Sequence, residues 1–331
     1  MTDLPTAIRT VRWMVWDTFR QSLASKLFWV MFGLTALCSV FCLGTSVDIP
    51  GERRRHPAEI PDRLPVTESS PEAEQSGIPK GGGRMRLGFG LFETPVPKFR
   101  DDAVRFLQVW LAGILADTVG VLLALVWTAG FLPSFLEPQS VTVLLAKPTP
   151  RWTLLAGKYL GVVLFVALHA VLFVAGTWTA TGLATGVWDA VYWLAVPLLV
   201  VNFAVFYAFS ALLAVASRST VVAVFGTILF WVLCWAMNIT RHHLVGFDVA
   251  GVTATSMVLV EVGYWVLPKP LDLSGIFFEA MRAADFSAPV PEFAAVRDKD
   301  AFHPLASIFA SLAFAAAVLA LAAYEFRKTD Y

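Results

Sequence analysis

The sequence has few charged residues and no excess of either sign. Charged residues make up 15% of its 331 positions, and 25 Lys and Arg balance 25 Asp and Glu, so the formal net charge is +0. An ordinary soluble domain has about 25% charged residues, so this composition excludes that class. The lack of a basic surface also argues against nucleic acid as a partner.

The motifs of an ATPase and of an intramembrane hydrolase are absent. Gly157-Lys158 is followed by Tyr159, where a phosphate-binding loop needs Ser or Thr. The sequence contains neither H-E-x-x-H nor G-x-S-x-G. We therefore expect a chain that is not an enzyme and binds no cofactor. If ATP drives it, another subunit binds the ATP and Mg²⁺.

Candidate metal ligands are also scarce. The 3 cysteines, Cys38, Cys42 and Cys234, lie in apolar runs and are expected to pack as small hydrophobic residues. Arg241-His242-His243 could supply two ligands, but no third lies nearby in the sequence. An anchor at the membrane interface is the preferred interpretation of this triplet, and no metal site is predicted.

Long apolar runs dominate what is present. The 57% of hydrophobic residues concentrate in stretches of about 20, enough to cross the roughly 30 Å of hydrocarbon in a bilayer. These runs predict an all-α, polytopic membrane protein with a single permease domain over 1–331. About six spans are expected, at 27–47, 105–132, 158–180, 190–216, 220–238 and 304–324.

The N-terminal residues 5–24 carry apolar side chains at helical spacing and predict an amphipathic helix that lies on the membrane. A plain extension of the first span is the alternative. Basic residues precede the first span, follow the last and occupy the short turn at 217–219. This distribution predicts that both termini are cytoplasmic.

Two polar regions, 48–102 and 241–303, are expected outside the cytoplasm. The first is rich in Pro and Gly, and its stretch 84–92 alternates in a way that indicates a strand. The second contains 255–267, which is too short and too charged for a span and is expected to form a re-entrant or interfacial helix. An amphipathic piece is predicted at 276–284.

The connection between spans two and three, residues 134–152, has a readable local structure. Pro138 can begin a short helix behind Glu137, and Pro148 ends it. Thr149-Pro150 can then cap a new helix at once. Val141, Leu144 and Leu145 then fall on one face of the short helix by their spacing.

This turn resembles the cytoplasmic coupling helix of ABC-2 type transporter permeases. The matching positions are Glu137, Pro148, Arg151 and Gly157-Lys158, and the ending at 326–330 is also similar. The resemblance implies the membrane subunit of an ABC exporter in the bacterial inner membrane. It further implies a separate ABC ATPase as partner and pairing of two permease chains, as a homodimer or a heterodimer, in the lipid bilayer. The ATPase would contact the turn through seven residues: Glu137, Val141, Leu144, Leu145, Pro148, Arg151 and Lys158.

Three polar residues fall inside predicted spans: Asp117, His169 and Asn202. Polar groups at that depth are costly and by default mark a functional site, here a translocation path. A hydrogen-bonded cluster that only fixes helix packing is an equal alternative. Two other functions stay open: an assembly or anchoring protein whose outside loops bind partners, and an intramembrane enzyme that uses Asp117 and His169.

Overall fold

The computed structural model describes residues 4–49, 83–97, 99–135, 151–247, 249, 251–287 and 291–328. These parts contain six helices that are long and apolar enough to cross a membrane. The predicted all-α bundle of about six spans is confirmed. The spans are Lys26–Leu43, Arg100–Phe135, Trp152–Thr185, Ala190–Ser217, Thr220–Gly246 and Pro304–Lys328.

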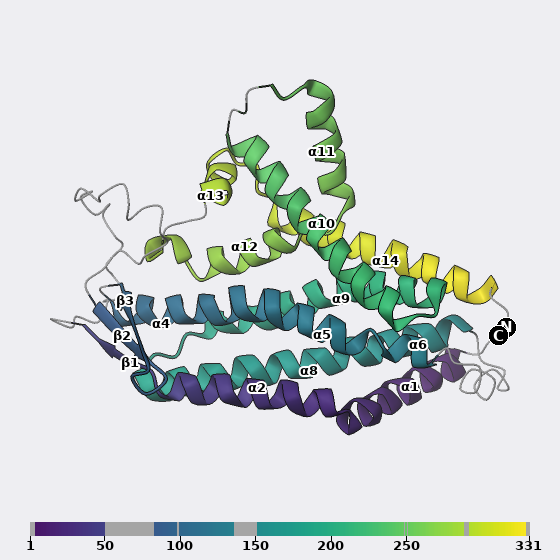
Figure 1. Cartoon of the computed structure of the whole chain (residues 1–331), viewed down its shortest axis with the longest axis horizontal. Coiled ribbons are helices and arrows are strands. Elements are labelled where there is room, and N and C mark those ends of the chain that lie inside the picture. Colours follow the sequence, from purple (N-terminus) through teal and green to yellow (C-terminus); the bar gives the residue numbers. More distant parts are fainter. Residues whose placement is uncertain are drawn as a thin grey trace.

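Most of the spans run side by side along the long axis of the molecule (Figure 1). The chain termini lie at one end of this bundle, and the small β-sheet lies at the other. The side-by-side spans are α2 (Lys26–Leu43), α8 (Arg151–Thr185), α9 (Ala195–Ser217) and α14 (Pro304–Lys328). Helix α10 (Thr220–Gly246) instead leaves the bundle at an angle, and α11 (Ala254–Val266) lies beside its far end (Figure 1).

The second span is not one regular helix. It consists of α4 (Arg100–Gln108), the π-helix η1 (Val109–Gly120), α5 (Val121–Thr128) and the short α6 (Phe131–Phe135). A π-helical segment of 12 residues is unusual, because π turns occur mostly as single bulges and often at functional sites. The apolar sequence of this span predicts its length but not this change of pitch.

Helix α1 (Leu4–Ala24) packs along the first half of α8 because two glycines leave room for it. A Cβ on Gly157 would lie 2.8 Å from the Met14 side chain, and one on Gly161 would lie 2.7 Å from Thr18 Oγ1. Ser25 then caps α2 by accepting a hydrogen bond from the Leu27 backbone N–H. The N-terminal helix is therefore partly buried against a span.

The sheet contains β1 (Ser46–Asp48), β2 (Gly83–Leu87) and β3 (Phe92–Val96) in antiparallel order β1-β2-β3. Its register pairs Ser46 with Arg86 and Gly83 with Val96. The strand expected at 84–92 is thus the first arm of a hairpin that turns at 88–91. The sequence pattern missed the turn because Phe89 and Leu91 are apolar residues in turn positions.

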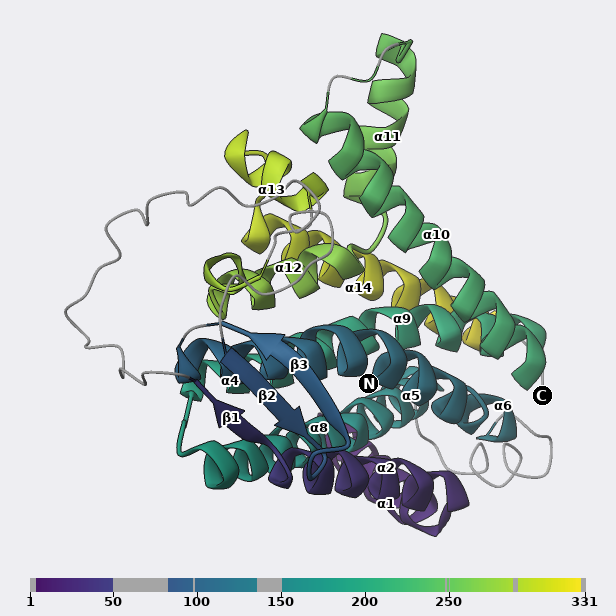
Figure 2. The same ribbon diagram turned by 60° about the vertical axis from the view of Figure 1, so that its left-hand side comes forward.

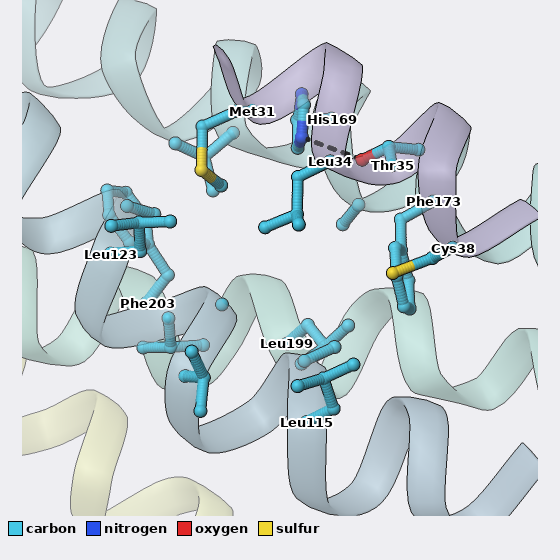
Figure 3. Close-up of a pocket in the computed structure, with 17 residues that line it drawn as sticks. Met31, Leu34, Thr35, Cys38, Leu115, Leu123, His169, Phe173, Leu199 and Phe203 are labelled. Atoms are coloured by element: carbon cyan, nitrogen blue, oxygen red, sulfur yellow. Dashed lines mark hydrogen bonds between the residues drawn. The ribbon is translucent and has the colours of Figure 1, made fainter. Parts of the chain in front are cut away.

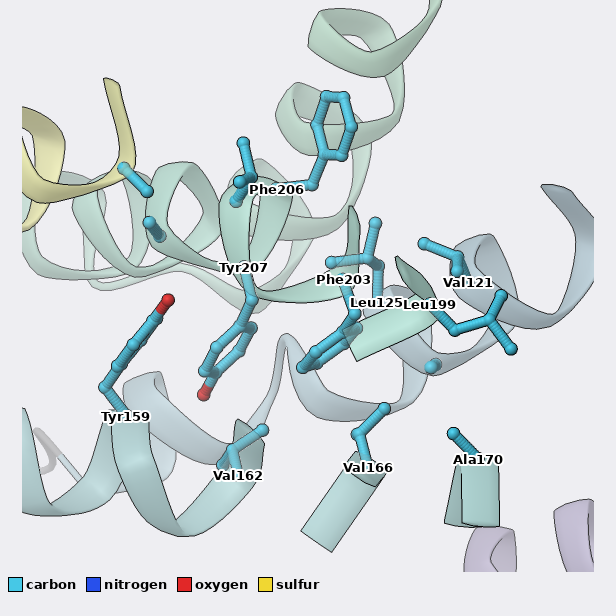
Figure 4. Packing of buried hydrophobic residues seen from close by; sticks show 14 of the residues in the cluster. Val121, Leu125, Tyr159, Val162, Val166, Ala170, Leu199, Phe203, Phe206 and Tyr207 are labelled. Carbon is cyan, nitrogen blue, oxygen red and sulfur yellow. The ribbon is translucent and has the colours of Figure 1, made fainter. Parts of the chain in front are cut away.

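The bundle core is centred on α9, whose aromatic side chains stack on those of α8 (Figure 4). Tyr207 stacks on Tyr159 with ring centroids 5.6 Å apart and on Phe203 at 5.3 Å. Val162 and Leu199 pack beside these rings (Figure 4). This apolar layer fixes α8 against α9. The short η2 (Ala190–Leu194) joins the two helices.

Between spans five and six, the chain forms α11, α12 (Pro270–Ala280), η3 (Ala283–Asp285) and α13 (Pro291–Asp298). The expected helices at 255–267 and 276–284 correspond to α11 and to the second part of α12. Helix α12 packs against η1, α9, α10 and α14. It is therefore built into the helical bundle.

Candidate functional site

Asp117 ties three helices together at the middle of the second span. Its Oδ1 accepts a hydrogen bond from Asn202 Nδ2 on α9 at 2.7 Å, and its Oδ2 accepts one from Ser274 Oγ on α12. Both Asp117 and Asn202 are buried. Two of the three polar residues predicted to form a path therefore do meet, and their common partner is the inserted helix α12.

Helix α12 can approach η1 this closely because of Gly113. A Cβ on Gly113 would lie 2.3 Å from the Phe278 ring and 3.1 Å from the Phe277 ring. On the other side of α12, a Cβ on Gly275 would lie 2.3 Å from the Phe293 ring of α13. Small residues thus seat α12 between two neighbours, as they do at other close helix contacts in membranes.

A second carboxylate, Asp272, lies in the first turn of α12 and is fully buried. Its Oδ2 accepts hydrogen bonds from the hydroxyls of Tyr264 on α11 and Ser307 on α14. Its Oδ1 lies 3.0 Å from His242 Nε2 and 3.4 Å from Asn238 Nδ2, both on α10. Asp272 thereby joins α10, α11, α12 and α14 at one point.

Two basic side chains border this cluster. Arg241 Nε lies 3.3 Å from Glu261 Oε2, its NH1 donates to the Ala301 carbonyl, and its guanidinium lies 4.4 Å from the Tyr264 ring centroid. Lys269 Nζ donates to the Leu267 carbonyl and lies 4.9 Å from the same ring. The charges are compensated locally, as buried charges must be.

This arrangement corrects the interpretation of Arg241-His242-His243. The triplet was expected to anchor the protein at the membrane interface, but Arg241 and His242 are buried because α11, α12 and α13 cover that end of α10. Sequence reasoning also missed Asp272, Lys269 and Tyr264. The available signal was that charged residues follow span five at 261, 269 and 272 within otherwise apolar sequence.

His169 lies elsewhere. Its Nε2 is 3.2 Å from Thr35 Oγ1, so it ties α8 to α2 rather than to Asp117. The pair borders a largely apolar cavity of about 120 Å³ between α2, η1, α5, α8 and α9 (Figure 3). Leu34, Leu123 and Phe203 also line this cavity. The three predicted path residues therefore belong to two separate places.

Most of the predicted coupling turn lies outside the described residues, namely Glu137, Val141, Leu144, Leu145 and Pro148. Arg151 is the first residue of α8. Lys158 is buried, and its Nζ donates to Gln21 Oε1 on α1 and lies 5.9 Å from the Phe131 ring centroid. Lys158 thus connects α8 to the N-terminal helix.

The polar clusters hold helices together. In the described part of the chain, no group of three or more His, Cys, Asp or Glu side chains could hold a metal ion. Asn202 Oδ1, beside Asp117, is buried and has no hydrogen-bond partner among the described residues. The site positions α12 against η1 and α9.

The fold and these buried polar groups define an integral, multi-pass membrane protein. Residues 12–249 match the model of the family described as ABC-2 family transporter protein, and the chain belongs to this family. It is therefore a membrane subunit of a transporter. No curated protein and no solved structure matches the chain.

Proposed function

We propose that this chain is the permease subunit of an ATP-driven exporter in a bacterial cytoplasmic (inner) membrane, with both termini in the cytoplasm. A separate ABC ATPase binds ATP and Mg²⁺ and hydrolyses the ATP, while this chain has no enzymatic activity of its own. The observation that carries the proposal is the family match over residues 12–249, together with six spans and no nucleotide-binding motif in the sequence.

The position of the connection between spans two and three supports docking of the ATPase there. Helix α6 ends at Phe135 and α8 begins at Arg151, both at the end of the bundle where the chain termini lie (Figure 1). The chain therefore leaves α6 and enters α8 at that end of the bundle. Glu137 and the apolar residues after it are the proposed contacts with the ATPase.

A second permease chain, identical or similar, is proposed to pair through α10 and α11. This hairpin leaves the bundle (Figure 2). Large apolar side chains of α10 and α11 are exposed. Phe225 and Leu229 of α10 are 69% and 71% exposed, and Leu259 of α11 is 73% exposed. A partner's spans would cover these apolar side chains.

In the proposed cycle, closure of the ATPases moves residues 136–150 and with them the adjoining ends of α6 and α8. Displacement of η1 relative to α12 would separate Asp117 from Ser274 and expose Asp117 and Asn202 to the path. The hydrogen bonds of Asp117 with Ser274, and those of Asp272 on α12 with the neighbouring helices, hold α12 in place. It therefore returns to one defined position when these bonds form again.

The test is purification of the tagged protein from its native host in mild detergent, beside a Glu137→Arg variant and an Asp298→Arg control. Asp298 is exposed on α13, in the region between spans five and six. We expect an ATPase to co-purify with the wild type and the control but not with Glu137→Arg. Absence of any ATPase, even after gentle cross-linking, would favour an assembly or anchoring protein instead.

A further inference from the structure

The turn between β2 and β3 presents large apolar side chains to its surroundings. Phe89 is 76% exposed, Leu91 is 77% exposed, and Phe92 at the start of β3 is 62% exposed. Turns outside a membrane are normally built from Gly, Asn, Asp, Ser and Pro. A cluster of exposed apolar side chains on such a turn indicates a surface that contacts something apolar.

The turn is fixed to the end of α2. The Phe89 backbone N–H donates a hydrogen bond of 3.0 Å to the Gly44 carbonyl. A Cβ on Gly44 would lie 2.3 Å from Phe89 N, and one on Gly88 would lie 2.4 Å from the Phe41 ring. Glycine at both positions therefore lets the backbone of the turn lie directly on the helix.

This attachment sets the depth of the turn. Helix α2 is the first span and ends at Leu43, so Phe41 and Gly44 mark the level where its apolar segment stops. The Phe92 ring lies 6.1 Å from the Phe41 ring. The β2–β3 turn therefore lies at the boundary between hydrocarbon and headgroups, where aromatic residues are favoured.

The turn also continues the lipid-facing surface of α2. Residues 37, 40, 41 and 44 share one face of a helix by their spacing. On this face Leu37 is 64% exposed and Val40 is 51% exposed, while Phe41 and Gly44 touch the turn. Figures 1 and 2 both show the turn beside the end of α2.

The charges of the hairpin suit a lipid surface. Arg84 and Arg86 alternate along β2 with Met85, which is buried against the bundle. The Arg84 and Arg86 side chains are 77% and 53% exposed, and both lie within 4.0 Å of Glu93. Guanidinium groups at this level can bind lipid phosphates, while Glu93 and Asp48, the partner of Arg84 on β1, balance their charge.

We propose that the β2–β3 turn is a membrane anchor, in which Phe89, Leu91 and Phe92 insert into the outer leaflet of the bilayer while Arg84 and Arg86 face the headgroups. The anchor holds the sheet, and with it the start of α4 that follows β3, at the outer surface of the membrane. This role is separate from transport and requires no ATPase.

The experiment places an environment-sensitive fluorophore on the full-length protein in phospholipid nanodiscs. Phe89→Cys and Leu91→Cys are labelled in a Cys38→Ala background, since Cys42 and Cys234 are buried. Asp48→Cys, an exposed position on β1, is the matched control. The lipids carry a doxyl group high on the acyl chain, and iodide serves as the aqueous quencher.

We expect the doxyl lipids to remove most of the fluorescence at 89 and 91 but not at 48, and iodide to quench only the probe at 48. Leu91→Cys keeps the test decisive if Phe89→Cys disturbs the turn. Iodide quenching at both 89 and 91 would overturn the proposal. Protection of the probes at 89 and 91 from both quenchers, together with excimer fluorescence between copies labelled with pyrene, would also overturn the proposal. That result would show that the β2–β3 turn contacts a second copy of the chain.

Discussion

The Asp117 cluster leads to a quantitative comparison of two substitutions at one position. In Asp117→Asn, the new amide keeps an acceptor for Asn202 Nδ2, and its NH₂ group can donate to Ser274 Oγ, because a hydroxyl both donates and accepts. In Asp117→Leu, both hydrogen bonds disappear and the Asn202 amide is left buried without a partner. The two variants therefore separate the effect of the hydrogen bonds from that of the charge.

The magnitudes follow from the strength of the two bonds. A hydrogen bond to a charged group contributes about 1.5–3 kcal/mol and one between neutral groups about 0.5–1.5 kcal/mol. Asp117→Asn weakens two bonds and should cost about 2–3 kcal/mol, while Asp117→Leu loses both and should cost about 3–6 kcal/mol. The predicted order is thus wild type, then Asn, then Leu.

The assay is reversible unfolding in mixed micelles by titration with a denaturing detergent, with fluorescence as the signal. Transport or ATPase stimulation, once a partner is identified, gives the second measurement on the same variants. Equal destabilisation by Asn and Leu would refute the reasoning, because the charge would then outweigh the hydrogen bonds. An Asn variant that is stable but inactive would assign the Asp117 charge to the path rather than to packing.

Three further predictions concern contacts around α12 and α1. Gly113→Ala places a methyl group 2.3 Å from the Phe278 ring and should destabilise the protein by about 1–3 kcal/mol. Gly120→Ala should not destabilise it, because the nearest atoms to the added methyl group are 3.8 Å away. Thermal unfolding of the two variants measures the difference. Tyr264→Phe removes one donor to Asp272 and should cost about 1–3 kcal/mol, with the exposed Tyr324→Phe as an unaffected control in the same assay. Gly161→Ala should push α1 away from α8. A disulfide cross-link between cysteines introduced at Val11 and Ala156 should then form in lower yield. Gly33→Ala, where no atom lies within 4 Å of the added methyl group, should leave this yield unchanged.

The spans were predictable because apolar length alone nearly determines a membrane helix. Even so, α8 begins at Arg151 rather than near 158, so the helix extends beyond its apolar run. The π-helix of η1 and the insertion of α12 could not be predicted. Both depend on contacts between segments far apart in the sequence, such as Gly113 against Phe278.

The candidate site was predictable only in part, for a similar reason. Their position deep within apolar runs identified Asp117, Asn202 and His169 as unusual. This position does not predict which helix faces contact each other. Asp117 and Asn202 meet, whereas His169 is turned toward Thr35. His242 was expected at the interface because its position in the sequence marks the end of a span, and the later segments that bury it leave no local signal. The coupling turn at 136–150 stays a prediction.

Helix α8 has one further consequence. Its 35 residues form a rod of about 50 Å, longer than the hydrocarbon is thick. At the end near the sheet, Arg100 donates to the Thr185 carbonyl, and Arg105 forms an ion pair of 2.6 Å with Asp189 just beyond α8. At the other end, residues 136–150 join the same two spans. Spans two and three are thus connected to each other at both ends, so we expect a displacement of the chain between them to move the two spans together.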